Sequence, residues 1–239
     1  MEKVVRTLAG LLCGSLAAGT APAEWSGKGR LGGVLARGNT ETTTLNAHMD
    51  VLNDVERWHH KFGTSVLRTL SQDVITADRW ELRAESDYRP TRRTYMFGSL
   101  RYEDDQFTDY EYQATGAVGY GYHFIENEDT KLDAKLGVGA RATELRLTGE
   151  TEREDILRGA LVFEHHLTDT TLVFNRYLIE SGSTNTFMQN QFGIEVKINH
   201  ALALGLGYEV RRNTDVLPGT RNSDQLYTAN LVFGFGVPP

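Results

Sequence analysis

The dominant pattern along this chain is an alternation of apolar and polar residues with period two. Residues 79–88 give the clearest example. One face of this segment would carry the charged residues Arg79, Glu81, Arg83, Glu85 and Asp87. The other face would carry Trp80, Leu82, Ala84 and Tyr88. Successive side chains of a β-strand point to opposite faces, whereas a helix repeats every 3.6 residues. The pattern therefore predicts a strand with one apolar and one charged face.

Similar alternation recurs along the rest of the chain, interrupted by clusters of turn-forming residues. It predicts twelve strands at residues 25–37, 40–52, 56–68, 77–88, 93–104, 109–124, 130–143, 154–166, 170–180, 186–198, 200–212 and 224–236. An even number of strands suits a closed up-and-down barrel with both ends of the chain on one side. Segment 93–104 carries aromatics on both faces, so we expect a bulge there. The two faces of segment 170–180 are similar in composition, so the pattern does not show which of them points into the barrel.

The connections between these segments favour a membrane barrel, because outer-membrane barrels alternate short periplasmic turns with longer external loops. Short connections are predicted at 53–55, 89–92, 126–129, 167–169 and around His200. The connections at the opposite, external end are predicted to be longest at 70–76, 144–153 and 213–223. The external connection around 38–40 is a short exception. Because every second connection, beginning with the one after the second strand, is short, we expect the N-terminus of the barrel to lie in the periplasm.

The direction of the charged face follows from the number of strands. Twelve strands enclose more space than ordinary side chains fill, whereas about eight pack solid, so an apolar interior would leave a large cavity. With charged residues inside, opposite charges pair across a wet lumen and the apolar residues face lipid. We therefore predict an all-β, up-and-down antiparallel transmembrane β-barrel in the bacterial outer membrane. The predicted lumen residues are Arg79, Glu81, Arg83, Glu85, Lys131, Asp133, Lys135, Arg158, Glu164, Glu195, Lys197, Glu209 and Arg211.

The first 23 residues have the pattern of a secretory signal peptide. Lys3 and Arg6 precede an apolar run, and the small residues of 21–23 form a cleavage site, so we expect the barrel domain to span residues 24–239. Cys13, the single cysteine, would be removed with this segment. The formal charge of −7 would become −8, because Glu2, Lys3 and Arg6 are lost. This acidic balance argues against nucleic acid as a partner.

The last predicted strand resembles the signal that the outer-membrane barrel assembly machinery reads. Its apolar face would carry Tyr227, Leu231, Phe233 and Phe235, and four residues follow the final aromatic. We therefore expect that machinery as a partner during biogenesis, and outer-membrane lipid and lipopolysaccharide as surroundings of the folded barrel.

Two groups of residues invite a metal interpretation. The neighbours in His59-His60 and in His165-His166 point to opposite strand faces, and no cysteine completes a zinc set, so we predict no metal site there and no cofactor. An acidic cluster of Glu103, Asp104, Asp105 and Asp109 lies in or beside the third external loop. Its oxygen donors could hold a divalent cation, but the spacing of a calcium loop is absent, which favours a solvated acidic loop.

An outer-membrane lipid hydrolase is the enzymatic alternative, since a serine and a histidine on the lipid-facing surface could cleave lipid esters. Candidate serines are Ser65, Ser99 and Ser181. The sequence pairs none of them with a histidine, because the partners would come from different strands.

Three segments carry a family resemblance. The runs 38–47 and 97–107, together with Tyr112-Gln113-Ala114 and Gly119-Tyr120-Gly121-Tyr122, resemble the domain-of-unknown-function 481 family over almost the whole mature chain. Members of that family are described as salt-induced outer-membrane proteins of Gram-negative bacteria, so the resemblance implies location and fold but no activity. The leading hypothesis is a narrow polar channel for ions or small solutes, or a structural envelope protein, and not an enzyme.

Overall fold

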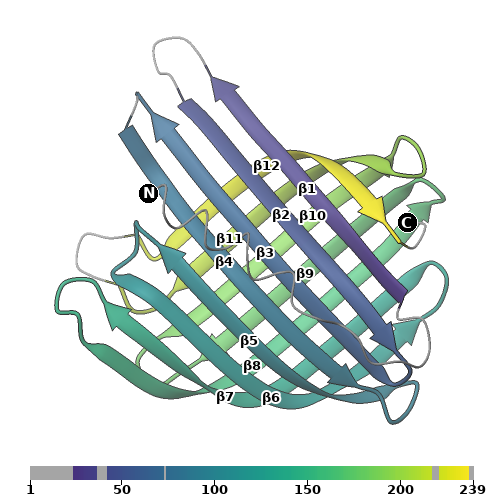
Figure 1. Cartoon of the computed structure of the whole chain (residues 1–239), viewed down its shortest axis with the longest axis horizontal. Helices are drawn as coiled ribbons and strands as arrows, with labels where there is room; N and C mark the ends of the chain where they lie inside the picture. Colours follow the sequence, from purple (N-terminus) through teal and green to yellow (C-terminus); the bar gives the residue numbers. More distant parts are fainter. Residues whose placement is uncertain (1–23, 37–41, 73, 217–220, 237–239) are drawn as a thin grey trace, which may run out of the picture.

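The computed structural model describes residues 24–36, 42–72, 74–216 and 221–236 (Figure 1). The predicted signal peptide, with Cys13, and the predicted connection at 38–40 lie outside the described residues. The strands are β1 (Glu24–Ala36), β2 (Thr42–Val55), β3 (Trp58–Ser71), β4 (Val74–Tyr88), β5 (Thr94–Asp105), β6 (Tyr110–Glu126), β7 (Thr130–Leu145), β8 (Thr151–Thr168), β9 (Thr171–Ser181), β10 (Thr186–Lys197), β11 (Leu202–Asn213) and β12 (Ser223–Phe235). Within the described ranges, no helix is long and apolar enough to cross a membrane.

The twelve strands form one closed barrel, in which each strand pairs antiparallel with its neighbours in the chain and β1 pairs with β12. Figure 1 shows the strands strongly tilted, so that those at the front and at the back of the barrel cross in projection. Tilt of this kind is what closure of a sheet into a barrel requires. The predicted all-β up-and-down barrel of about twelve strands is confirmed.

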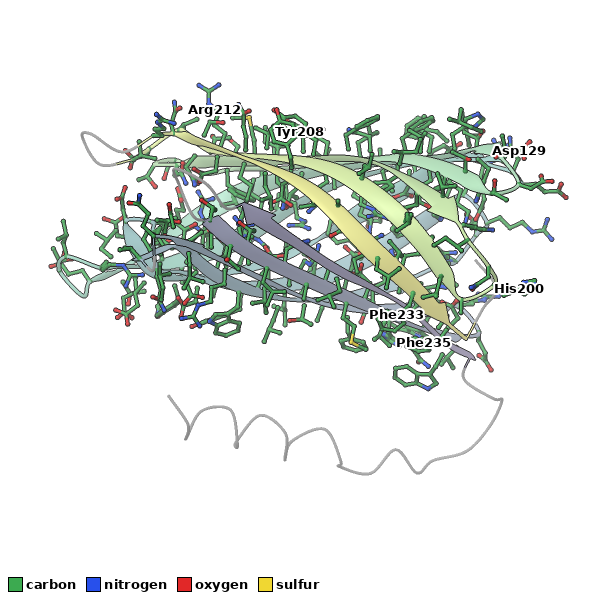
Figure 2. All side chains as sticks on the ribbon, turned by 90° about the horizontal axis from the view of Figure 1, so that it is seen from above. Asp129, His200, Tyr208, Arg212, Phe233 and Phe235 are labelled. Carbon is green, nitrogen blue, oxygen red and sulfur yellow. The ribbon has the colours of Figure 1, made fainter. Side chains whose placement is uncertain are left out.

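Both ends of the described barrel lie at the same side, because Gly27 near the start of β1 pairs with Phe235 at the end of β12. Figure 2 shows Asp129, His200 and Phe235 at this end and Arg212 at the opposite end. We call the first the periplasmic end and the second the external end, following the orientation expected from the sequence.

The connections alternate in length less clearly than predicted. The predicted loop at 70–76 is mostly strand, because β3 continues to Ser71 and β4 begins at Val74. The predicted loop at 144–153 shrinks to residues 146–150, because β7 and β8 stay paired as far as Glu144 and Thr151. This external connection is no longer than the periplasmic one at 89–93. The sequence prediction ended these strands where polar residues occur on both faces. The hydrogen bonds between the backbones of neighbouring strands continue through such residues, so the strands are longer than predicted.

The two segments with unclear faces are regular strands. β5 pairs with β4 and β6 without a register shift, so the bulge expected in 93–104 is absent. Tyr95 and Phe97 point inward, where both rings are buried, and Met96 is exposed on the other face. In β9 the buried Phe174 and Glu180 define the inward face.

The seam that closes the barrel combines glycines of β1 with phenylalanines of β12. Gly27 pairs with Phe235, and Gly29 pairs with Phe233. A Cβ atom at Gly29 would lie 2.2 Å from the ring of Phe233, so only a residue without a side chain allows the ring to lie flat on β1. The seam therefore depends on the same aromatic residues that the sequence marks as an assembly signal.

Candidate functional site: the charged interior of the barrel

The alternation along β4 separates a buried charged face from an exposed apolar one. Glu81 and Asp87 are 4% and 0% exposed, whereas Trp80 and Leu82 on the opposite face are 37% and 42% exposed. Isolated buried charges are costly, so they occur in pairs or networks. In the described part of the barrel we distinguish three such networks, and Arg83 connects the first with the third, because it lies 3.0 Å from Glu81 and 3.5 Å from Asp50.

The first network, in the external half, connects walls of the barrel that lie far apart in the ring. Arg211 of β11 pairs with Glu103 of β5. Arg101, also on β5, lies 3.1 Å from Glu103 and 2.6 Å from Glu180 of β9. Both guanidinium groups are also 3.9 Å from Glu81 of β4. Ion pairs thus join four strands. Those between β5, β9 and β11 are also charged hydrogen bonds, which are the strong ones.

The same network extends toward β10 and β11. Arg79 of β4 lies 3.2 Å from Glu209 of β11, and Gln191 of β10 donates to the other oxygen of Glu209 at 2.7 Å. The ring of Phe187, which is 1% exposed, lies between two guanidinium groups. The carbon atoms Cζ of Arg101 and Arg211 are 4.7 Å and 5.0 Å from its centroid, within the range of cation–π contacts.

The second network fills the periplasmic half near β3, β4 and β7. Lys61 Nζ lies 3.1 Å from a Glu85 oxygen and 2.9 Å from an Asp87 oxygen. Lys135 of β7 reaches the same two carboxylates from the other side. Tyr95 donates a hydrogen bond of 2.6 Å to Asp133, next to this cluster.

The third network surrounds a small cavity between β1, β2 and β9–β12. Lys28 and Arg30 of β1 each lie 2.9 Å from Glu195 of β10, and Arg30 is 3.2 Å from Asp50. The adjoining cavity has a volume of about 60 Å³, and His48 also lines it. Polar spaces of this size hold water. This cavity is small, and Arg30, His48 and Glu195 contribute polar groups to its lining beside apolar side chains.

The remaining predicted lumen residues lie near these networks. Arg158 pairs with Glu180, and Glu164 accepts a hydrogen bond of 2.8 Å from Arg176. Arg83 lies 3.0 Å from Glu81. Lys131 is exposed beside Glu164 at the periplasmic end, and Lys197 is half-buried at the end of β10. The structure thus gathers most predicted residues into networks and places these two lysines near the rim.

Several members of the networks are absent from the sequence prediction. Arg101 and Glu180 lie in the two segments whose faces the sequence left unclear, and Arg30 and Asp50 lie in β1 and β2, from which the sequence prediction took no lumen residue. Asp87 belonged to the charged row of 79–88 and could have been included. The pairing across the lumen leaves no signal in the sequence, because it depends on the width of the barrel.

The acidic residues considered as a cation site do not converge. Glu103 and Asp105 are buried on the inward face of β5, and Glu103 is paired with two arginines. Asp104 is on the opposite face of the strand. Among the described residues, no group of three or more His, Cys, Asp or Glu side chains is arranged to hold a metal ion.

The outer face of the barrel is apolar and aromatic. Tyr227, Leu231, Phe233 and Phe235 of β12 are all exposed, and Figure 2 shows Phe233 and Phe235 at the seam. Tyr208 contacts Tyr227 on the same surface, with 4.7 Å between the ring centroids. Exposed aromatics on a strand face are typical of the surface that contacts lipid.

A closed ring of antiparallel strands, apolar outside and ion-paired inside, defines the class of this protein as a β-barrel of the outer-membrane type. The chain belongs to the family of proteins of unknown function DUF481, whose profile matches residues 29–235. No curated protein matches this chain.

Two solved structures share the fold at low sequence identity. The NanC porin is 10% identical, with a TM-score of 0.50 and coverage of 87% of this chain and 97% of that chain. The translocator domain of the autotransporter NalP from Neisseria meningitidis is 13% identical, with a TM-score of 0.50 and coverage of 98% of this chain and 95% of that chain. Both likenesses concern the barrel fold alone.

Proposed function

We propose that this protein is a narrow polar channel for ions and small hydrated solutes in the bacterial outer membrane. The observation that carries the proposal is the set of ion pairs that join β4 and β5 to β11 and narrow the lumen. The described residues include no separate plug segment inside the barrel. Charged walls of both signs lower the cost of passage for a small ion, because each ion meets a group of opposite sign. Larger solutes would have to break the pairs.

A structural envelope protein is the alternative that the same interior supports. In that case the ion pairs act only as permanent bridges between the walls, and no solute passes. The two functions differ in one measurable property, which is the conductance of the closed barrel.

The test is single-channel recording of the refolded chain, residues 24–239, in a planar bilayer. A shift in gel mobility on heating identifies the closed barrel. We expect small, steady steps for the wild-type protein and steps several-fold larger for the double variant Glu103→Ala/Arg211→Ala. A control variant, Arg68→Ala/Asp78→Ala, removes a pair between neighbouring strands that is 4.0 Å apart and partly exposed, and should leave the steps unchanged. Closed barrels that are silent for both the wild type and the double variant would reject the channel.

The proposal also covers how the protein is exported, how it is assembled and when it is expressed. Residues 1–23 would direct export, the strand ending at Phe235 would engage the barrel assembly machinery, and lipopolysaccharide would surround the external end. The family resemblance adds induction by salt. Fractionation of cells grown at low and high NaCl, followed by immunoblotting, tests location and induction together.

A further inference from the structure

A polar row of three hydrophilic side chains, ending at a glycine, crosses the outer face near the periplasmic end. Asn53 of β2 pairs with His60 of β3, His60 pairs with Ser86 of β4, and Ser86 pairs with Gly98 of β5. Residues directly opposite in antiparallel strands share one face, with Cβ atoms about 4.5–5.5 Å apart. Trp58 and Phe62, two residues either side of His60, are 46% and 48% exposed, so this face is the outer one.

Ser86 and His60 have the geometry of a nucleophile and its base. The Ser86 hydroxyl Oγ lies 2.9 Å from His60 Nδ1. A serine attacks an ester when an adjacent base takes its proton, and a third group that orients the base completes such a site. The His60 ring is held by stacking on Trp58, with centroids 5.9 Å apart and planes within 7°. Asn53, which is 7% exposed, lies on the other side of His60, and its Nδ2 has no hydrogen-bond partner in the described part of the structure.

The depth of this row matches the level of lipid ester groups. Trp25, Trp58 and Tyr88 surround it on the outer face, and Trp58 contacts Tyr88 with ring centroids 5.0 Å apart. Belts of tryptophan and tyrosine lie at the boundary between headgroups and acyl chains. A phospholipid of the periplasmic leaflet therefore presents its acyl esters at the height of Ser86.

A groove for an acyl chain begins one step further into the membrane. It has a volume of about 680 Å³, in the range of small-molecule sites. Phe62, Ala84, Leu100 and Gly116 line it. The first three lie two positions along their strands from His60, Ser86 and Gly98, and Gly116 pairs with Leu100. Its lining is almost wholly apolar. Beside Ser86, a Cβ atom placed on Gly98 would meet no atom within 4 Å, so the ester group has free space there.

We propose that Ser86 and His60 form an esterase site that releases an acyl chain from glycerophospholipids of the periplasmic leaflet, with Asn53 as a positioning residue. Ser86 Oγ bonds to the ester carbonyl carbon and its proton passes to His60 Nδ1. The ester C–O bond breaks, and His60 returns the proton to the lysophospholipid alcohol. Water, losing a proton to His60, then cleaves the acyl-serine ester and yields the fatty acid. Ser86 recovers its proton from His60.

The experiment measures fatty acid and lysophospholipid release by mass spectrometry, using the refolded barrel in phosphatidylethanolamine and phosphatidylglycerol vesicles. We expect release by the wild type, loss of at least 100-fold in Ser86→Ala and His60→Gln, and no change in Ser99→Ala, a serine on the inward face of β5. A fluorophosphonate probe should label Ser86 in the wild type, which identifies the nucleophile even if a variant misfolds. A closed wild-type barrel that neither releases fatty acid nor takes up the probe would overturn the proposal, as would full activity in Ser86→Ala.

Two further variants separate substrate binding from positioning. Gly98→Ala adds a Cβ atom beside Ser86 that meets no other atom within 4 Å, and it should raise KM with little change in kcat. Asn53→Ala should lower kcat at least 10-fold, and Asn53→Asp should restore most of it, because a carboxylate oxygen, like the amide oxygen, can accept a hydrogen bond from the imidazole N–H. A structural role of Asn53 alone would give equal loss in both variants. Channel recordings on the same preparations test the two proposals separately. The residues of the esterase site lie on the outer face and those of the proposed channel in the lumen, so the esterase variants should leave the conductance unchanged.

Discussion

Arg211 of β11 and Glu103 of β5 form an ion pair between strands that are half-way round the ring from each other. A ring of twelve strands lies between the small barrels that side chains fill and the large porins that keep a wide channel. Long charged side chains are therefore able to meet at the middle of this lumen. Arg101 strengthens the contact from β5 by binding Glu103 and Glu180 together.

Loss of Arg211 should destabilise the barrel strongly. The Arg211→Ala variant leaves the buried Glu103 with a single arginine, and breaking a buried pair costs about 3–5 kcal/mol. Urea unfolding in lipid vesicles, followed by tryptophan fluorescence, measures the loss. The double variant Glu103→Leu/Arg211→Leu should be closer to the wild type, because it leaves no unpaired charge. Equal stability of Arg211→Ala and the wild type would show that the pair contributes nothing.

Reversal of charge inside the lumen should change ion selectivity. Arg79 and Arg83 lie beside Glu209 and Glu81, and replacing both with Glu adds two negative charges while removing two positive ones. We expect the reversal potential in a KCl gradient to move toward cation selectivity. The matched control is Arg68→Glu, which changes a partly exposed residue of β3. A reversal potential that stays the same in the double variant would place Arg79 and Arg83 away from the ion pathway.

The seam of the barrel should be sensitive to one glycine and tolerant of another. A side chain at Gly29 would collide with the ring of Phe233, whereas one at Gly33 would meet only a Thr44 carbonyl oxygen at 3.3 Å. Gly29→Ala should therefore cost about 1–3 kcal/mol, as overpacked sites do, and Gly33→Ala should cost less. The temperature at which heating changes gel mobility ranks the two variants. A higher temperature for Gly29→Ala than for Gly33→Ala would contradict the packing described at the seam.

The sequence predicts the strands and their faces because a membrane barrel gives each strand one apolar and one polar side. The charged row of 79–88 is the plainest case, and its placement on β4 needed no knowledge of neighbours. The pattern of one strand does not predict which residues it contacts on other strands. The pair Ser86 and His60 depends on register, since a slip of one residue would turn either side chain to the other face. Arg101 and Glu180 depend on the width of the closed barrel, which no local pattern encodes.

Phe187 should act as a spacer that narrows the lumen at the level of the first network. Its buried ring packs between Arg101 and Arg211, so the ion pairs and the ring together occupy this cross-section. Phe187→Ala should open space there and raise the single-channel conductance several-fold while every charged residue is retained. The variant should also lose about 3–5 kcal/mol of stability, as buried Phe→Ala changes do. Phe192→Ala, which removes a 48% exposed ring from the outer face of the same strand, is the control and should leave the conductance unchanged. Equal conductance for both variants would show that the ring does not limit the pathway, and that the charged side chains alone set its width.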